Sequence, residues 1–228
     1  MSEWWTYRLT SFLLFSPRTY YRLLELYNLA IWPAQLAGMV IGLAIVALLI
    51  GKRGHRDRII AGLLAACWLW IAWAFHYQRY AQINWAASWF AAAFACEALL
   101  LVVVGVLAGR LVLQRASGGK LWIATSIVAI SVLGYPLLAP LAGRPWTTVE
   151  IFGVAADPTA IATIAALALV RGRIRWLLLV LPLLWCAVAA ATLWAMNALE
   201  GLVVVAAGLL ALWPAVPGTR HDAPDTMR

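Results

Sequence analysis

The sequence predicts an all-α fold, a polytopic membrane helix bundle of seven transmembrane helices with an interfacial amphipathic helix before them. The 228 residues are 65% hydrophobic and only 11% charged, with a mean hydropathy of +0.88, whereas soluble domains carry about 25% charged residues. Several apolar stretches approach the roughly 20 residues that cross a bilayer. Basic residues also alternate between the connecting loops, as the positive-inside rule requires.

Residues 1–28 form the amphipathic segment. Ser16 and Pro17 predict a helix start, with serine as the N-cap and proline at the first helical position. Apolar and charged side chains then recur on opposite faces. The apolar face holds Tyr20, Leu23, Leu24 and Tyr27, and the polar face holds Arg18, Arg22 and Glu25. This pattern is typical of a helix in the membrane interface, and equally of a docked segment that only covers the bundle.

Residues 29–214 form the transmembrane domain, and residues 215–228 are expected to be a disordered cytoplasmic tail. The predicted spans are 29–50, 59–80, 86–109, 121–142, 155–171, 175–196 and 198–214. The fifth is short, because the 13 residues from Pro158 to Val170 give about 20 Å of helix. Asp157 as N-cap and Pro158 at the first helical position predict a helix that begins below the outer surface.

The distribution of basic residues predicts an orientation. Twelve of the 17 lysines and arginines fall in the loops around 52–58, 110–120 and 171–175 and in the tail, and five fall on the other side. We therefore expect the N-terminus outside and the C-terminus in the cytoplasm of a bacterial inner membrane. The net charge of +8 does not indicate nucleic-acid binding, because the basic residues form no single stripe.

Tryptophan follows the predicted membrane boundaries. Most of the 14 tryptophans fall near one interface or the other, as an aromatic belt does. Trp68, Trp70 and Trp185 are predicted near mid-depth instead. An indole N–H in an apolar environment needs a hydrogen-bond acceptor, so at least some of these three side chains should point into the bundle.

Glu97 is the most informative candidate site residue, because it lies at the centre of the third predicted span. A carboxylate at that depth costs about 2.5 kcal/mol or more, and such residues are usually functional. Two interpretations stay open. Glu97 is a proton relay or solute-binding group, or it makes an interhelical hydrogen bond to a residue such as Ser131.

Further candidates cluster at the outer ends of the spans and suggest a polar vestibule that binds a small solute. These substrate-binding candidates are His76, Arg79, Tyr80, Asn84, Tyr135, Glu150 and Asp157. The recessed fifth helix would aim its first N–H groups into this vestibule, which favours an anion. For His76 taken alone, a hydrogen bond to a loop carbonyl is the competing interpretation.

The sequence contains no motif of the common hydrolases, metalloproteases or nucleotide-binding proteins. We therefore assign no catalytic residue, cofactor or metal. Retinal attachment is excluded because the two lysines, Lys52 and Lys120, lie in loops. The three cysteines share roughly one depth, so a soft-metal site is an alternative to three small buried side chains.

Several passages resemble an uncharacterised bacterial family of small multi-span inner-membrane proteins. They are SEWWTYRLTSFLLFSPRTYYRLLELYN, AWAFHYQRYAQINWAA, YPLLAPLAGRPWTTVEIFGVAADPTA and PLLWCAVAAATLWAM. The resemblance implies an integral membrane protein, sometimes labelled permease-like, and transfers no catalytic residue. The resulting hypothesis is a binder or transporter of a small solute. The alternative is a non-transporting scaffold, sensor or assembly subunit that recognises a protein partner or a second copy, and an intramembrane enzyme comes third.

Overall fold

The computed structural model describes residues 15–51, 54–113 and 118–215. Over these ranges the chain is helical, and its only strand-like pairing is an isolated bridge between Leu113 and Val170. The all-α prediction is therefore confirmed. The first half of the amphipathic segment and almost all of the tail lie outside the described residues.

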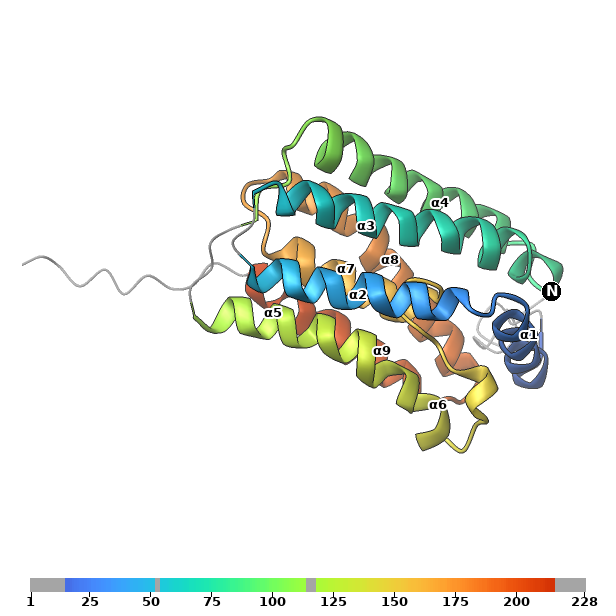
Figure 1. The fold of residues 1–228 in the computed structure, drawn as a ribbon. Coiled ribbons are helices and arrows are strands. Elements are labelled where there is room, and N and C mark those ends of the chain that lie inside the picture. The colour runs from blue at the N-terminus through green and yellow to red at the C-terminus, as the bar shows by residue number, and fades with distance from the viewer. Residues whose placement is uncertain (1–14, 52–53, 114–117, 216–228) are drawn as a thin grey trace, which may run out of the picture.

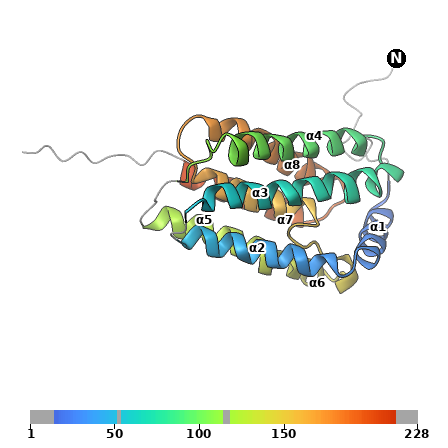
Figure 2. The same cartoon turned by 45° about the horizontal axis from the view of Figure 1, so that its top comes forward.

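Helix α1 (Pro17–Ala30) lies across one end of the bundle, at 89° to α2 (Ala34–Ile50), as Figures 1 and 2 show. Its start is as predicted, since the Ser16 side chain accepts a hydrogen bond from the Thr19 backbone N–H at 3.1 Å. The face bearing Tyr20, Leu24 and Tyr27 is buried against the bundle. The predicted amphipathic helix is thus confirmed for the second half of its segment.

Three further apolar segments are interrupted helices. The first is α3 (Arg56–Trp70), continued by π-helix η3 (Ile71–Tyr77) and 3-10 helix η4 (Tyr80–Gln82). The second is α4 (Ala87–Leu100) with π-helix η5 (Leu101–Leu107). The third is α5 (Gly119–Ala129), which continues through η6 (Ile130–Gly134) and η7 (Tyr135–Leu137) into α6 (Leu138–Leu141). A 3-10 turn, η8 (Trp146–Thr148), follows.

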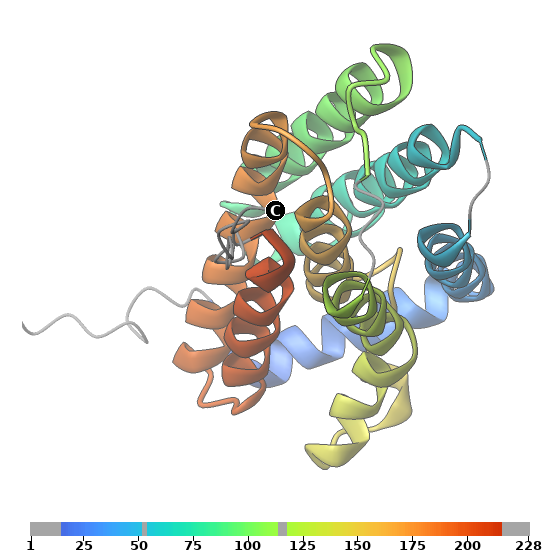
Figure 3. The ribbon, with the colours of Figure 1, turned by 90° about the vertical axis from the view of Figure 1, so that its left-hand side faces the viewer.

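Helix α7 (Ala156–Ala168) is the centre of the bundle. All 13 of its residues are buried, and it packs against α3, α5, α8 (Ile174–Ala195) and α9 (Glu200–Leu212). Figure 3 shows these helices around it. The preceding stretch 149–155 is not helical and is almost entirely buried. Helix α7 therefore begins inside the bundle, and residues 149–155 do not join it.

The predicted spans agree with the helices to within a few residues, except that α2 begins at Ala34 rather than at 29. Four helical segments are long and apolar enough to cross a membrane: Arg56–Gln82, Ala87–Leu107, Gly119–Leu141 and Ile174–Ala195. The bent pair α1–α2 would make a fifth. Helix α7 and the segment Glu200–Ala215, which includes 3-10 helix η9 (Trp213–Ala215), are apolar but shorter. The structure therefore supports four or five spans by length, not the full count of seven.

The two ends of the bundle differ in charge. The end covered by α1 carries the turn 76–84 and lies opposite the connection that precedes α3 (Figure 1). We call these the α1 end and the opposite end. Within the described residues the α1 end holds Arg18, Arg22, Arg79 and Arg144. The opposite end holds Arg56, Arg58, Arg110, Lys120, Arg171, Arg173 and Arg175.

Two glycines of α2 allow the buried stretch before α7 to approach closely. A Cβ atom at Gly38 would overlap the carbonyl oxygen of Phe152, and one at Gly42 would lie 2.9 Å from the Phe152 ring. Gly153 meets Gly38 in turn and has φ +84°, which a side chain would strain. This small-xxx-small spacing is the pattern that lets membrane helices pack backbone to backbone.

Candidate functional site

The candidate site is centred on the Asp157 carboxylate, beneath α1. Asp157 is the second residue of α7 and is only 4% exposed. Its Oδ1 accepts a hydrogen bond from Trp185 Nε1 at 2.8 Å, and its Oδ2 accepts one from the Tyr135 hydroxyl at 3.3 Å. The carboxylate therefore joins α7 to α8 and to η7 in the buried interior.

Asp157 is not the N-cap of α7, contrary to the sequence-based prediction. The N-cap is Ala155, which makes no side-chain capping bond. The side chain of Asp157 bonds to donors on two other elements instead of the first N–H groups of its own helix. An anion at this helix mouth is consequently disfavoured, because a carboxylate of the chain already lies there.

A small cavity of about 10 Å³ adjoins this carboxylate. It is lined by Tyr20, Tyr80, Asp157, Trp185, Ala189, Thr192 and Leu193. A volume of this size holds about one water molecule. The cavity lies on the buried face of α1, to which Tyr20 belongs, so α1 covers it from above.

The non-helical stretch that leads into α7 is held by specific hydrogen bonds. The Thr159 hydroxyl accepts from the Gly153 N–H at 2.8 Å and donates to the Ala155 carbonyl at 2.7 Å. The Tyr27 hydroxyl of α1 donates to the Val154 carbonyl at 2.8 Å. These bonds fix the position at which α7 begins, and hence the place of Asp157.

All three mid-depth tryptophans find acceptors inside the bundle, as their predicted depth requires. Trp185 bonds to Asp157, and Trp68 Nε1 donates to Thr163 Oγ1 at 3.0 Å. Trp70 Nε1 donates to the Tyr27 hydroxyl at 3.1 Å.

His76 lies beside the cavity residues Tyr80 and Trp185, among aromatic rings. It is fully buried, and its ring centroid is 4.4 Å from that of Phe94 and 4.8 Å from that of Trp185. Neither ring nitrogen has a hydrogen-bond partner among the residues that the structure describes. The expected bond to a loop carbonyl is therefore wrong. The reason is that the π-helix η3 turns this side chain inward, toward α4 and α8.

Glu97 is also fully buried, and the expected hydrogen bond from a neighbour is wrong. Both carboxyl oxygens lack a partner within ranges 15–51, 54–113 and 118–215. Ser131, the proposed partner, donates instead to the Ile127 carbonyl of its own helix at 2.9 Å. Phe94, one turn earlier on α4, packs against Trp68, with the ring centroids 4.3 Å apart and the ring planes tilted by 38°. Glu97 is thus an isolated buried acid, separate from the Asp157 network in hydrogen bonding.

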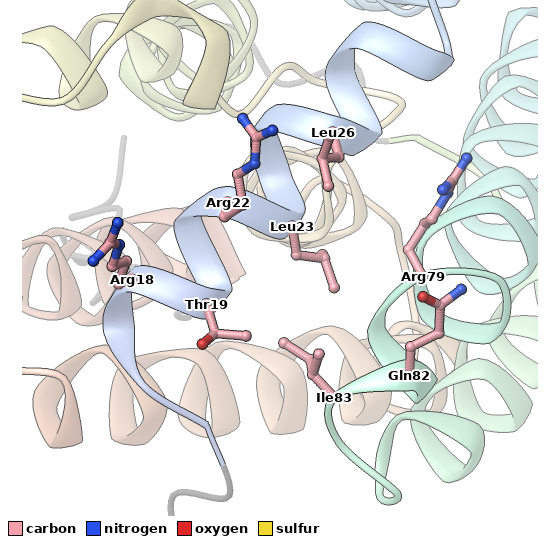
Figure 4. A pocket seen from close by; sticks show the side chains of 8 residues that line it. All are labelled: Arg18, Thr19, Arg22, Leu23, Leu26, Arg79, Gln82 and Ile83. Atoms are coloured by element: carbon pink, nitrogen blue, oxygen red, sulfur yellow. The ribbon is translucent and has the colours of Figure 1, made fainter.

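Arg79 and Asn84 do not join the Asp157 network. Arg79 lines a second, larger pocket on the other side of α1, between α1 and η4 (Figure 4). Asn84 Oδ1 accepts a hydrogen bond from the Ala86 N–H at 3.0 Å and so shapes the turn before α4. Of the predicted site residues, Tyr80, Tyr135 and Asp157 come together, with Glu150 electrostatically close to Asp157.

A family model described as a family of unknown function (DUF6064) matches residues 18–223. The chain belongs to the DUF6064 family. The matched range contains all the predicted site residues. It also contains Tyr20, Trp185 and Thr192, which line the cavity. Neither a curated protein nor a solved structure matches the chain. The resemblance to a family of unknown function is therefore confirmed.

Two aromatic residues that line the cavity of this DUF6064 protein, Tyr20 and Trp185, were not predicted as site residues. The role of Trp185 could have been predicted from the sequence, because an indole N–H in an apolar environment needs an acceptor and the buried Asp157 carboxylate is one. Tyr20 was assigned to the apolar face of α1, which is correct, but the cavity beneath that face was not expected.

The cysteines of the DUF6064 chain do not form an enclosed thiol site. Cys67 and Cys186 are buried, whereas Cys96 is exposed. No group of three or more His, Cys, Asp or Glu side chains suited to a metal ion occurs in the part of the chain that the structure describes. The soft-metal alternative is therefore not supported.

Glu150 lies in the buried stretch before α7 and is 9% exposed. Burial raises the pKa of its carboxyl group above the usual range, and the nearby Asp157 carboxylate raises it further. The positive charge of Arg144 lowers the pKa of Glu150. The Arg144 guanidinium also forms an ion pair with Glu200 at 3.1 Å and lies over the Tyr21 ring.

Glu150→Gln is expected to stabilise the purified protein at alkaline pH. Below about pH 4 the carboxyl group is protonated in both the folded and the unfolded states, so the pKa shift has no effect. As the pH rises, the unfolded state ionises first and the stability of the wild type falls, by about 1.4 kcal/mol for each unit by which the folded pKa is raised. Thermal unfolding in detergent at about pH 4.5 and about pH 8.5 measures this. The variant should gain over the wild type only at the higher pH, and a constant difference would contradict the shift.

Proposed function

We propose that this DUF6064 protein is an integral protein of the bacterial inner membrane with seven spans, its N-terminus outside and its C-terminus in the cytoplasm. Four helices and the bent pair α1–α2 have the length and composition of spans. Helix α7 and the segment beginning at Glu200 complete the seven, because α7 is enclosed by longer helices and needs no lipid contact. Within the described residues, the opposite end carries seven basic residues and the α1 end four, which favours the opposite end as cytoplasmic.

Single-cysteine labelling tests this orientation. In a background with Cys67, Cys96 and Cys186 replaced by alanine, Gln82→Cys places a thiol at the α1 end and Arg173→Cys places one at the opposite end; both positions are exposed. A membrane-impermeant maleimide should label Gln82→Cys in intact cells and Arg173→Cys only after permeabilisation. The reverse pattern would invert the proposed topology.

We further propose that the protein is a permease-like binder of a small cation. The observation that carries this proposal is the acceptor-rich cavity beneath α1, in which a buried carboxylate adjoins the side chains of Tyr20, Tyr80 and Thr192. No lysine or arginine side chain lines it. A buried carboxylate with surrounding oxygen atoms favours a positively charged ligand. A volume of about 10 Å³ limits that ligand to a proton carried on water or a small metal cation such as sodium.

The cavity is narrow and lies beneath α1, so the route to it would run past α1. The C-terminal part of α1 is held by Asn28, whose Nδ2 donates to the Thr147 and Val149 carbonyls at 2.9 and 2.8 Å. The N-terminal part, which carries Tyr20, makes ring contacts with Tyr80 at 5.9 Å instead. Displacement of this N-terminal half would open the cavity toward the α1 end.

The competing function, a scaffold, sensor or assembly subunit, is favoured by a different observation. His76 and Glu97 are fully enclosed, and no hydrogen bond in the described part of the chain connects them to the cavity. A bundle that is closed below Asp157 offers the cation no path to the opposite end in this conformation. The two functions therefore differ in whether the reconstituted protein moves a cation at all.

Flux in proteoliposomes tests the proposal, with protons followed by a trapped pH dye and sodium by radioactive uptake. We expect the wild type to carry one of the two ions at a rate reduced at least about tenfold by Asp157→Asn, which keeps the size of the side chain and removes its charge. Asp57→Asn, at the opposite end, is the matched control and should stay within about twofold of the wild type. Absence of flux of both ions in the wild type, or equal flux in Asp157→Asn, would favour the partner-binding function.

A further inference from the structure

A second pocket, larger than the cavity at Asp157, lies between α1 and η4 at the α1 end. Its volume is about 370 Å³. Figure 4 shows α1 on one side of it, with Arg18, Arg22 and Leu23, and the turn after η3 on the other side, with Arg79 and Ile83. We call it the arginine pocket.

The arginine pocket has an excess of positive charge. Three arginines line it, and no acidic side chain does. Arg22 is paired with Glu25 at 2.6 Å, on the neighbouring turn of α1. The guanidinium groups of Arg18 and Arg79 make no ion pair or hydrogen bond within the described ranges. Arg18 and Arg79 line the pocket from separate elements, and Figure 4 shows their guanidinium groups apart, on its two sides. This positive lining suits a ligand with an anionic phosphate, because guanidinium binds phosphate oxygens bidentately.

The rest of the pocket wall is aliphatic. Leu23 and Leu26 of α1 and Ile83 of the turn lie between Arg18 and Arg79 (Figure 4). A free inorganic anion would gain nothing from this surface, whereas the glycerol and upper acyl carbons of a lipid would be buried against it. The pocket is therefore matched to an amphiphile and not to a small hydrophilic anion.

The position of the pocket agrees with a lipid headgroup. Trp32 follows α1 directly and is 65% exposed, and Trp85 and Trp89 follow η4 and are each 70% exposed. Exposed tryptophans at one end of an apolar bundle mark the depth of the membrane interface. The phosphates of the lipids in that leaflet would lie at the level of Arg18 and Arg79.

We infer that the arginine pocket binds the phosphate of an anionic phospholipid in the leaflet at the α1 end. This inference rests on the proposed membrane location but not on cation binding. Arg18 and Arg22 project from the exposed side of α1, whereas the Asp157 cavity lies under the buried side that carries Tyr20. A bound lipid would contact both α1 and η4 and so hold the N-terminal half of α1 over the cavity.

Titration calorimetry on the purified full-length chain in an uncharged detergent tests the inference. The probes are short-chain phosphatidylglycerol, short-chain phosphatidylcholine and inorganic phosphate. We expect phosphatidylglycerol to bind more tightly than the other two. The double variant Arg18→Gln, Arg79→Gln should weaken its binding at least about tenfold, because two charge-assisted contacts are lost.

The matched control is Arg171→Gln, Arg173→Gln, which removes the same charge from exposed positions at the opposite end. It should leave the affinity for phosphatidylglycerol within about twofold. Equal weakening in both double variants would overturn the pocket as the site.

Inorganic phosphate that binds as tightly as phosphatidylglycerol and displaces it would overturn the lipid in favour of a free anionic solute. Equal binding of phosphatidylcholine would overturn the requirement for an anionic headgroup. None of these results depends on ion flux, so this inference and the cation proposal can fail separately.

Discussion

Asp157→Ala is expected to destabilise the folded protein by about 2–5 kcal/mol, because it leaves two buried donors without their acceptor. These donors are Trp185 Nε1 and the Tyr135 hydroxyl, which come from α8 and η7. The loss should appear as a lower midpoint of thermal unfolding for the purified protein in detergent. The substitution also removes the contact that joins three elements around the cavity, so the effect should exceed that of removing a surface acid.

Two further variants separate hydrogen bonding from charge. Asp157→Asn keeps one carbonyl acceptor and should lose less stability than Asp157→Ala. Trp185→Phe removes the indole donor, and its effect should not add to that of Asp157→Ala, since the two residues share one interaction. Strict additivity of the two substitutions, or wild-type stability in Asp157→Ala, would show that this network does not hold the helices together.

Gly38→Ala is expected to destabilise the protein by about 1–3 kcal/mol or more, because the added methyl group meets backbone that cannot rotate away. The nearest atom is the Phe152 carbonyl oxygen, in the buried stretch that positions α7. Relieving the overlap would push α2 away from residues 152–153 and shift the start of α7. Thermal unfolding measures the stability, and the cation flux of the same sample reports whether Asp157 has moved.

Gly62→Ala is the control for Gly38→Ala. Gly62 is also in the interior of an apolar helix, but a Cβ there would meet only a Val106 methyl group, at 3.7 Å. Its helix should gain up to about 1 kcal/mol from the better propensity of alanine. Equal destabilisation in the two variants would mean that α2 does not rely on close backbone contact at Gly38.

The helices could be predicted because apolar length and helix-start residues are local properties of the sequence. Ser16 and Pro17 mark the start of α1, and the predicted ends of the spans fall near those of the helices. The short run after Asp157 likewise indicated a recessed helix, and α7 begins inside the bundle. What the pattern did not contain is the direction of each side chain around its helix.

That missing direction explains the outcome at the site. The burial of Glu97 agrees with its place in an apolar span, but His76 was expected in a polar turn and is fully buried. The rings around His76 and the isolation of Glu97 depend on how α3, α4 and α8 are rotated. Asp157 was assigned as the N-cap of its own helix because capping is the local rule, whereas two donors distant in sequence bind its side chain. Arg79 was predicted to line the vestibule, but it lies just before η4 and lines the arginine pocket instead.

If the protein is inserted in the membrane as proposed, the complete burial of α7 has a consequence for biogenesis. A 13-residue helix of about 20 Å is too short to partition from the translocon into lipid as an independent unit. Three of the helices that enclose it, α3, α5 and α8, belong to longer apolar segments, and α8 is synthesised after it. We therefore expect nascent chains that end before residue 174 to leave α7 uninserted and open to proteolysis, and to acquire resistance only when α8 has emerged.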